Sequence, residues 1–540
     1  MTNNEAKKTD WYLISILLLA AFLRLYLLNI KPPHHDEGIN GWFADQIAQR
    51  GFYHYDPTNY HGPLHFYIIY FFKLLFGRSL FALRLPSILM GLFSVYWITL
   101  FSRFFNRKLC LIAALGMAIS PGCVFYSRYA IHESDFVFFN ILLLWGILGL
   151  YLEGKSKYLW AVCLSICGVI LTKETYIIHI ACYACAFVAA FYLIKQSTKN
   201  EMLPVKQLWS MKDLTNILLV CGLLIIYFYS DAFSNFKSLY NLIGTFTPWI
   251  KTGTEHSGHE KPFFYWFNLF SRYEWIALFG LFCSISYIFH PDKWIRFISS
   301  YSVLVFLIYS FIPYKTPWCI VSLLWPFYFV AGQFISKHLE SKWRNELVVV
   351  FILVSIGSLY KCSKLNFVDY VDKKEPYVYV QTFTDLNYIT EPILKLAEKN
   401  PNFYNIRGHV IREPEWPLPW IFGDFKRIGY YKSKMKPEIY DADFLVVEKS
   451  RIQEVEEKLM GYYYTRLLQI RDSQDSTKVY FRYPLFKQVF PRQAPNFIPR
   501  NTNKNINTIY KRTPGQYSQM LQNRHYSNYS LNSMGIFQML

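Results

Sequence analysis

The chain has 540 residues, a formal net charge of +19 at neutral pH and 53% hydrophobic residues, among them 47 Phe and 43 Tyr. Apolar stretches of about 20 residues recur as far as residue 361, and this is the length that a helix needs to cross a bilayer core of roughly 30 Å. The stretches lack the polar–apolar alternation of membrane barrel strands. The composition therefore argues against a soluble protein and predicts a polytopic helical membrane protein.

The apolar stretches predict eleven membrane-spanning helices. In chain order they cover residues 11–30, 84–104, 108–127, 135–153, 158–173, 175–195, 214–232, 273–290, 297–312, 317–336 and 345–361. Residues 64–77 are apolar but shorter, which is typical of a helix that lies in the membrane interface.

Lysine and arginine are concentrated in alternate loops, the pattern of cytoplasmic loops in membrane proteins. With the N-terminus in the cytoplasm, the inner loops hold Arg103, Arg107, Lys108, Lys155, Lys157, Lys195, Lys199, Lys206, Lys212, Lys293, Arg296, Lys337, Lys342 and Arg344. These loops absorb much of the positive charge, so nucleic acid is not a predicted partner. We expect a multi-pass protein of the cell (inner) membrane, with membrane lipids as neighbours.

The composition changes after the last span. We expect a membrane domain at 1–365, an α/β domain at 366–485 and a disordered tail at 486–540 that is rich in Asn, Gln, Pro, Arg and Tyr. The α/β domain is predicted from β-rich runs at 377–380, 444–447 and 479–481 and from helical patterns at 391–398 and 452–460. An odd number of spans would place this domain outside the cytoplasm.

Five polar stretches fall on the predicted outer side of the membrane. The first long loop, 31–83, contains the adjacent carboxylates Asp36 and Glu37, and the others are 127–135, 172–175, 233–272 and 314–318. Ionisable groups gathered at one side of a helical bundle indicate a functional site.

The residue types on this side suit the transfer of a sugar from a lipid phosphate to a hydroxyl group. The hydroxyl needs a general base, for which Asp36 is the candidate with Glu37 beside it. The departing phosphate needs cations, and Arg128, Lys173, Lys315 and Arg84 are the candidates. The remaining candidate substrate-binding residues are His35, Tyr60, His61, Tyr129, His132, Glu133, Glu174, His256 and His259.

A metal site is the alternative interpretation of the outer-loop histidines. Their spacing matches no established ligand pattern, such as two histidines four residues apart on a helix with a glutamate nearby. We therefore predict no metal and no cofactor, and a divalent metal is the alternative.

The chain resembles the GT-C membrane glycosyltransferases. The acidic pair after the first span, the run Tyr-His-Gly-Pro-Leu at 60–64 and the Ser-Arg-Tyr turn at 127–129 with a following acid are similar to the protein O-mannosyltransferase and lipid A aminoarabinose transferase-like group. Residues 314–318 and 415–420 fit the subgroup associated with protein N-glycosylation loci. The resemblance covers residues 10–335 well and the following domain weakly.

The resemblance implies a GT-C-like fold, a polyprenyl-phosphate-sugar donor and a glycan, lipid or protein acceptor. It also implies catalysis on the non-cytoplasmic face, usually with inversion at the anomeric carbon. By position, Asp36 matches the catalytic acid of the first loop, Arg128 with His132 and Glu133 the second outer motif, and Lys173 with Glu174 a third. The sequence lacks the Trp-Trp-Asp signature of the metal-using oligosaccharyltransferases.

Two other classes of protein remain as alternatives. A transporter or lipid-linked-sugar flippase would place charges inside the membrane, and Arg24 within the first span fits that class. A receptor whose C-terminal domain binds glycans would not need Asp36.

Overall fold

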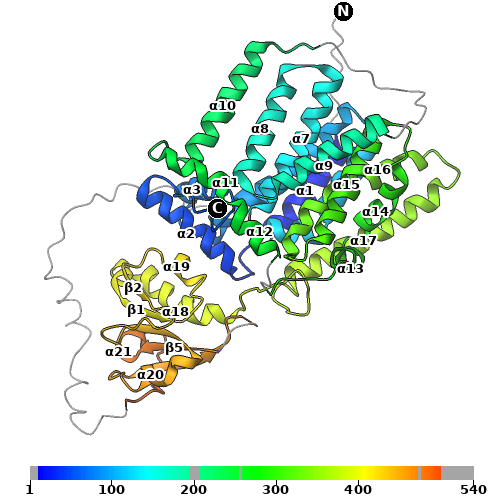
Figure 1. The fold of residues 1–540 in the computed structure, drawn as a ribbon. Coiled ribbons are helices and arrows are strands. Elements are labelled where there is room, and N and C mark those ends of the chain that lie inside the picture. The colour runs from blue at the N-terminus through cyan, green and yellow to red at the C-terminus, as the bar shows by residue number, and fades with distance from the viewer. Residues whose placement is uncertain (1–9, 194–206, 255–257, 472–475, 500–540) are drawn as a thin grey trace, which may run out of the picture. The chain divides into compact units, whose positions relative to one another are not determined.

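The computed structural model describes residues 10–193, 207–254, 258–471 and 476–499 (Figure 1). They form two compact units. The helical unit comprises residues up to Thr384 together with Trp416–Gly423 and Arg471, and the sheet unit comprises Asp385–Glu415, Asp424–Ile470 and the described residues from 476 onward. The first boundary thus lies at 384 and not at 365, and one short later segment belongs to the helical unit.

The helical unit is a bundle of apolar helices joined by short polar connections. In chain order it contains α1 (Trp11–Leu25), α2 (His35–Arg50), α3 (Leu64–Phe76), α4 (Leu80–Leu100), α5 (Arg107–Ile119), α6 (Pro121–Ser127), α7 (Glu133–Glu153), α8 (Ser156–Thr172), α9 (Tyr176–Val188), α10 (Met211–Tyr229), α11 (Tyr240–Gly244), α12 (Phe246–Thr254), α13 (Tyr265–Tyr273), α14 (Trp275–Tyr287), α15 (Lys293–Phe311), α16 (Ile320–His338), α17 (Arg344–Phe367) and α19 (Leu418–Ile421).

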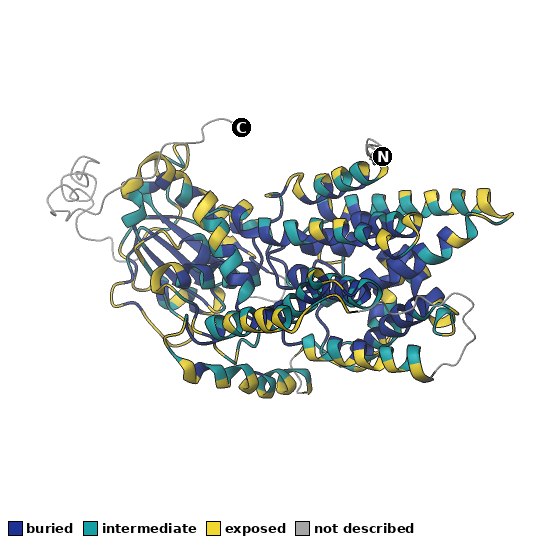
Figure 2. Ribbon diagram, turned by 90° about the horizontal axis from the view of Figure 1, so that it is seen from above, coloured by how far each residue is buried: buried dark blue, intermediate teal, exposed yellow. Residues whose placement is uncertain are grey.

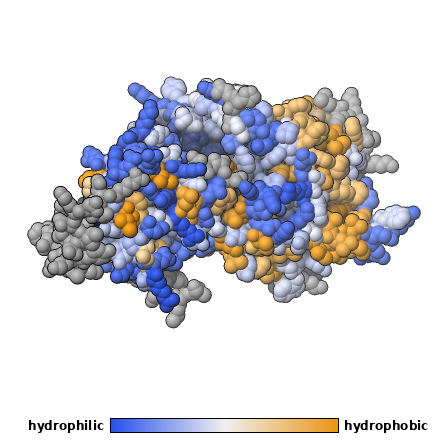
Figure 3. Space-filling view, turned by 90° about the horizontal axis from the view of Figure 1, so that it is seen from below, coloured by the Kyte–Doolittle hydropathy of each residue, from blue (hydrophilic) through white to orange (hydrophobic). Residues whose placement is uncertain are grey.

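The predicted fold class is confirmed. Within the described residues, six helices are long and apolar enough to cross a membrane, the bent pair α5–α6 makes a seventh, and five shorter apolar helices include α1, α8, α9 and α14. Each of the eleven predicted spans coincides with one of these helices or with the bent pair. Large apolar side chains of α10 and α17 are exposed, for example Leu219 and Leu353, and Figure 3 shows hydrophobic residues over much of the helical unit's surface. The protein is a multi-pass membrane protein.

The bend between α5 and α6 is built into the bundle by two buried charges. The two helices meet at 59°, because Pro121 cannot donate a backbone hydrogen bond to the preceding turn. Arg24 donates to the carbonyl oxygens of Met117 (3.3 Å) and Ala118 (3.2 Å) at the end of α5. Glu274 accepts hydrogen bonds from the Gly122 backbone N–H and the Ser120 hydroxyl, both at 2.7 Å. Arg24, the charge that fits a transporter, therefore satisfies carbonyl groups that a broken helix leaves free.

Ion pairs show which loops share an end of the bundle. The predicted inner loops meet at one end, where Asp10 pairs with Arg107, and Glu153 pairs with Arg103 and Lys155. The predicted outer loops meet through the pairs Glu37–Arg84, Glu133–Lys173 and Glu174–His61. The threading inferred from the basic loops is therefore reproduced, although Lys195, Lys199 and Lys206 lie outside the described residues.

The sheet unit has one five-stranded mixed sheet in the order β2-β1-β3-β5-β4. Its elements are α18 (Asp385–Lys399), β1 (Arg407–Ile411), β2 (Arg427–Tyr430), β3 (Phe444–Glu448), α20 (Ile452–Glu456), β4 (Tyr463–Leu468), β5 (Thr477–Arg482) and α21 (Tyr483–Phe486). Strand β1 runs parallel to β2 and β3, whereas β5 runs antiparallel to β3 and β4. Figure 2 shows its buried central strands in dark blue. Buried residues of α18 recur at helical spacing (Leu386, Ile389, Ile393, Leu396), so one face of the helix packs.

Two expectations for the C-terminal region need correction. Residues 377–380 form no strand, because they belong to the helical unit, where Tyr377 hydrogen-bonds to Glu274. Residues 486–499 fall in the predicted disordered tail, but Phe497 exchanges backbone hydrogen bonds with Tyr463 and Phe490 packs against Tyr464. The rest of the predicted tail, 500–540, lies outside the described residues.

Candidate active site

The acidic pair lies in the first turn of α2, where the two carboxylates have different environments. His34 caps the helix, since its imidazole Nδ1 accepts a hydrogen bond from the Asp36 backbone N–H (3.1 Å). Glu37 closes the capping box by accepting from the His34 backbone N–H (2.9 Å). This cap directs Glu37 into the bundle and leaves Asp36 at its edge.

Glu37 is fully buried and forms a bidentate ion pair with Arg84. The guanidinium Nε and Nη2 lie 2.7 and 2.8 Å from the two carboxylate oxygens. Arg84 also donates to the carbonyl oxygens of Leu28 and Pro32. Burial alone would raise the pKa of Glu37, but the ion pair outweighs burial and holds the pKa below its ordinary value. Glu37 and Arg84 thus anchor the loop after α1, and all three guanidinium nitrogens of Arg84 donate to groups of the protein itself.

Asp36 keeps 36% of its side-chain surface exposed. The Tyr129 hydroxyl lies 3.3 Å from the carboxylate Oδ2 and donates to it. Partial burial raises the pKa of Asp36 to about 6, with Glu133 and Glu37 adding to the rise, while Tyr129 and His61 oppose it. The remaining exposure reduces this shift through solvent screening. Of the two predicted catalytic carboxylates, only Asp36 keeps an exposed side-chain surface.

Arg128 does not face a binding site. It is 2% exposed, and its guanidinium donates to the carbonyl oxygens of Leu23, Arg24, Tyr26 and Leu27 at the end of α1. Its donors therefore cap a helix whose last carbonyls lack partners.

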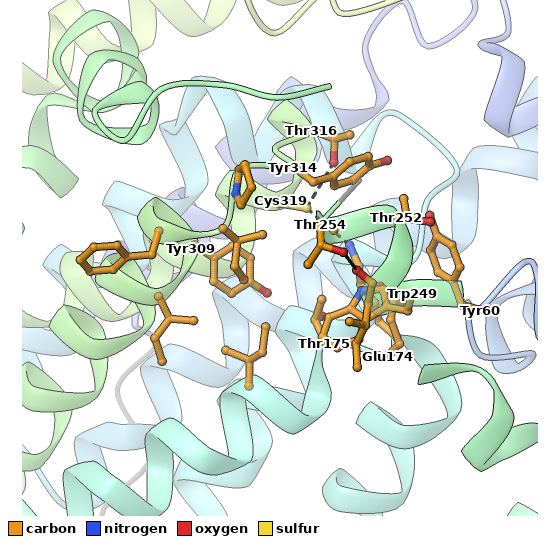
Figure 4. A pocket seen from close by; sticks show the side chains of 18 of the residues that line it. Tyr60, Glu174, Thr175, Trp249, Thr252, Thr254, Tyr309, Tyr314, Thr316 and Cys319 are labelled. Carbon is orange, nitrogen blue, oxygen red and sulfur yellow. Dashed lines mark hydrogen bonds between the residues drawn. The ribbon is translucent and has the colours of Figure 1, made fainter. Parts of the chain in front are cut away.

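A cavity of about 490 Å³ lies at the end of the bundle where the predicted outer loops meet (Figure 4). One part of its wall is polar and includes Tyr60, His61, Lys173 and Glu174. The rest of the wall is mostly apolar or aromatic and comes from α9, α12, α13 and α15 and from the turn before α16. Its apolar and aromatic residues are Ile178, Trp249, Ile250, Trp266, Ile308, Tyr309, Phe311, Ile312, Pro313, Tyr314, Trp318 and Cys319. Thr175, Thr252, Gly253, Thr254 and Thr316 complete the lining. Phe311 and Ile250 are 72% and 55% exposed, so the apolar wall reaches the surface of the helical unit.

The polar wall contains two linked charge pairs. Lys173 donates to the Glu133 carboxylate and to the Cys319 sulfur (3.6 Å). His61 Nδ1 lies 2.9 Å from Glu174 Oε2. Burial would raise the pKa of Glu174, but His61 and Lys173 outweigh it and lower that pKa. Among the predicted phosphate ligands, Lys173 is the one that lines the cavity.

Asp36 lies behind this polar wall. Its carboxylate interacts electrostatically with His61 and contributes to raising the pKa of Tyr314, and both residues line the cavity. Trp318, another wall residue, packs its ring edge-on against Tyr129 and His34, with centroids 6.3 and 6.2 Å apart. The structure therefore brings Asp36, Tyr129, His61, Glu133, Lys173 and Glu174 together with Tyr60.

Three of the outer-loop histidines form a stack. His132 lies between His61 and His65, with ring centroids 4.9 and 4.6 Å away. His65 pairs with the buried Asp135 at 2.6 Å. Burial lowers the pKa of His132 and keeps its ring neutral. Within the described ranges of the chain, no group of His, Cys, Asp or Glu side chains has the geometry to hold a metal ion.

The remaining candidates do not line the cavity or lie outside the described residues. Lys315 donates to the carbonyl oxygens of Lys261 and Ile312, and His259 Nδ1 lies 2.6 Å from the Tyr379 hydroxyl. The partly buried His35 has no hydrogen-bond partner on Nδ1 within the part of the chain that the structure describes. His256 is outside that part.

Several wall residues did not follow from sequence reasoning, notably Trp249, Thr252 and Tyr309. Figure 4 shows Trp249 and Thr254 of α12 beside Glu174 and Thr175, and Thr252 next to Tyr60. The available signal was the density of aromatic and hydroxyl residues in the second long outer loop, which contains α11 and α12.

Comparisons with known proteins bear on the fold of the helical unit and of the whole chain. Residues 60–226 match the model of the dolichyl-phosphate-mannose-protein mannosyltransferase family. The crystal structure of ArnT from Cupriavidus metallidurans bound to undecaprenyl phosphate is similar over 87% of this chain and 97% of its own, with a TM-score of 0.61 and 13% identity. Its apo state gives a TM-score of 0.59 at 12% identity, covering 88% and 98% of the two chains. The chain has a GT-C fold.

A third solved structure extends the likeness. The oligosaccharyltransferase of Archaeoglobus fulgidus, tethered to an acceptor peptide containing the NVT sequon, has a TM-score of 0.52 and 13% identity, and the match covers 86% of this chain and 74% of that one. No curated protein matches the chain by sequence. The resemblance to GT-C membrane glycosyltransferases is thus confirmed for the fold, and the reaction is argued from the site below.

Proposed function

We propose that this GT-C protein is a membrane glycosyltransferase that moves a sugar from a polyprenyl-phosphate donor to a hydroxyl group. The observation that carries the proposal is one cavity whose wall changes from apolar, at Phe311 and Ile250, to charged, at Lys173 and Glu174. A lipid-linked sugar has the same sequence of chemistry, with a prenyl chain, a phosphate and a polar ring. The match of residues 60–226 and the undecaprenyl phosphate bound by ArnT support the same class of donor.

The donor would enter with its first prenyl units against Ile178, Ile308 and Phe311, since apolar walls stabilise the lipid by excluding water. Its phosphate would lie against Lys173, which supplies a charge-assisted hydrogen bond, with His61 beside it. The sugar ring would contact Tyr314 and Trp318, because aromatic faces pack well against C–H groups of a sugar.

Asp36 would act as the general base. With a pKa near 6 it is ionised at neutral pH and still basic enough to share a hydroxyl proton in the transition state. The acceptor oxygen forms a bond to the anomeric carbon as the bond from that carbon to the phosphate oxygen breaks, and the proton passes to Asp36. Attack opposite the leaving phosphate inverts the anomeric centre, and Lys173 stabilises the phosphate that departs.

We also propose that the site and the sheet unit lie on the non-cytoplasmic side of the inner membrane, with the N-terminus in the cytoplasm. The support is the basic end of the bundle, where Arg103, Arg107 and Lys155 gather and which the positive-inside rule places in the cytoplasm. The acceptor is a glycan, lipid or protein hydroxyl. His61 and His65 are each paired with a carboxylate, Glu174 and Asp135, and we propose transfer without a metal cofactor.

The direct test uses the full chain in lipid nanodiscs with undecaprenyl-phosphate mannose as the probe donor and a panel of acceptor alcohols and peptides. We expect release of undecaprenyl phosphate coupled to glycosylation of an acceptor. Asp36→Asn should lower the rate by about 10²–10⁴-fold, as loss of a general base does.

Asp56→Asn is the matched control, because Asp56 is an exposed carboxylate of the same loop. The transfer rate of this variant should stay within about twofold of the wild-type rate, because substitutions at exposed positions ordinarily have small effects. Near-normal turnover by Asp36→Asn would remove Asp36 from the role of base. Donor binding without turnover by any acceptor, under conditions that move the lipid across a membrane, would favour a flippase.

A further inference from the structure

A hydrogen-bond chain behind Asp36 ends at a backbone carbonyl group. His34 Nε2 lies 3.1 Å from the carbonyl oxygen of Tyr379. A carbonyl oxygen only accepts hydrogen bonds, so Nε2 must carry the proton of the neutral imidazole. Burial lowers the pKa of His34 and keeps the ring neutral. Its Nδ1 is therefore an acceptor.

The Tyr129 hydroxyl has two acceptors and one proton. It hydrogen-bonds to His34 Nδ1 and also lies 3.3 Å from Asp36 Oδ2. The two rings meet edge-on, with centroids 4.7 Å apart. Whenever Tyr129 donates to His34, the Asp36 carboxylate loses the hydrogen bond that stabilises its charge. When Tyr129 donates to Asp36, the carboxylate becomes a weaker base.

We propose that Tyr129 and His34 are positioning residues that set how strongly Asp36 holds a proton, by dividing one hydroxyl hydrogen between the imidazole and the carboxylate. This inference rests on the proposed role of Asp36 as base. It reassigns Tyr129, which sequence reasoning placed among the substrate-binding residues, and it gives a role to His34, which lay outside that set.

The carbonyl that orients His34 is itself held on both sides. Two residues before it, the Tyr377 hydroxyl donates to Glu274 (3.1 Å) and its ring stacks on Tyr273 with centroids 4.3 Å apart. Two residues after it, Gln381 donates to the carbonyl oxygen of Pro32 (3.0 Å). The segment 377–381 therefore connects the buried carboxylate at the helix bend to the N-cap of α2, which explains why it is not a strand.

Other charged groups around Asp36 set the background for this division. Glu37 on the same helix and Glu133 at the start of α7 disfavour its ionisation, whereas His61 favours it. The Lys31 amino group, before α2, lies 5.1 Å from the centroid of the Tyr129 ring and 4.0 Å from that of Phe125, and burial lowers the pKa of Lys31 well below its ordinary value. None of these groups hydrogen-bonds to Asp36 in the described structure, which leaves Tyr129 as the adjustable contact.

The experiment is an infrared pH titration of the full chain in nanodiscs, without any donor. It follows the carbonyl stretch of protonated carboxyl groups, and the Asp36 signal is the difference between each background and the same background carrying Asp36→Asn. In the wild type we expect a midpoint near 6. Tyr129→Phe should raise the midpoint by about one pH unit, because the carboxylate loses a donor.

His34→Asn should move the midpoint in the opposite direction. Asparagine keeps the helix cap but is too short to reach Tyr129, so the hydroxyl is left to Asp36 and the midpoint falls by about half a unit. Tyr126→Phe is the matched control: Tyr126 lies on α6, its ring centroid is 6.4 Å from that of Tyr129, and its hydroxyl donates to the Tyr377 carbonyl. Its midpoint should equal the wild-type value.

An unchanged midpoint in Tyr129→Phe, or shifts of the same sign in Tyr129→Phe and His34→Asn, would overturn the inference. Thermal unfolding of each variant distinguishes the loss of the helix cap from a change in the proton affinity of Asp36. If His34→Asn does not fold, the midpoint of Tyr129→Phe is sufficient to test the inference. Because the titration needs no transfer reaction, it can succeed even if Asp36→Asn retains activity and the proposed function fails.

Discussion

The role that sequence suggests for Arg84, binding the donor phosphate, differs from the structural role that its contacts indicate. As a cation on the predicted outer side it is a candidate phosphate ligand, yet four of its hydrogen bonds go to the Glu37 carboxylate and to the carbonyl oxygens of Leu28 and Pro32. Arg84→Met would leave Glu37 fully buried with only two backbone N–H donors, from His34 and Ala130.

Removing one partner of a buried ion pair costs about 3–5 kcal/mol, because the remaining charge is uncompensated. We therefore expect Arg84→Met to lower the free energy of unfolding by that amount. Arg84→Met combined with Glu37→Leu should recover most of the loss, since no charge then remains buried alone. Arg50→Met, at the exposed end of α2, is the control and should change stability by less than about 0.5 kcal/mol.

The assay is reversible unfolding in mixed micelles followed by tryptophan fluorescence, together with KM for the probe donor. A phosphate ligand would behave differently, with raised KM and unchanged stability. If Arg84→Met retains wild-type stability while donor affinity falls by tenfold or more, the structural role assigned to the Glu37–Arg84 pair is wrong.

Three further predictions concern the site and its support. Asp36 must be ionised to act as base, so kcat/KM should fall about tenfold per pH unit as the pH drops below about 6 and level off above it, which a pH–rate profile measures. Lys173→Met should raise KM for the probe donor by about 10–100-fold through loss of a charge-assisted bond of roughly 1.5–3 kcal/mol, whereas Lys157→Met at the opposite end should leave KM unchanged. Gly41→Ala should destabilise the protein by about 1–3 kcal/mol in the same unfolding assay, because an added Cβ would lie 2.4 Å from the Trp420 ring. A free energy of unfolding within about 0.5 kcal/mol of the wild-type value, the ordinary range for surface substitutions, would contradict that contact.

The sequence predicted the helical spans well because a bilayer imposes one length and one polarity on every span. It also predicted which loops share an end, since alternate basic loops follow a simple rule. The sheet unit was harder, because a β-rich run such as 377–380 becomes a strand only when a neighbouring strand pairs with it. Here the Tyr377 hydroxyl donates to the Glu274 carboxylate instead. The residue pattern around 377–380 gives no information about that distant partner.

The candidate cations show the same limit at the site. Lys173 and Arg128 are both basic residues at the predicted outer side, and sequence alone treats them alike. In the fold, Arg128 donates to carbonyl groups at the end of α1, while Lys173 lines the cavity. The difference arises from where helices end, because each membrane helix leaves its last carbonyl groups without partners and arginine is well suited to several at once.

That requirement also explains why charges lie so deep in this bundle. Arg24 and Glu274 satisfy the two halves of the break between α5 and α6, and the break turns α6 so that Tyr129, just beyond its end, meets Asp36. In a straight helix, the residues after Ile119 would instead continue in the direction of α5. The buried charges would therefore act on the proposed reaction indirectly. They stabilise a bend that brings Tyr129 to Asp36, the proposed base, and Tyr377 connects the same Glu274 to the segment whose carbonyl orients His34.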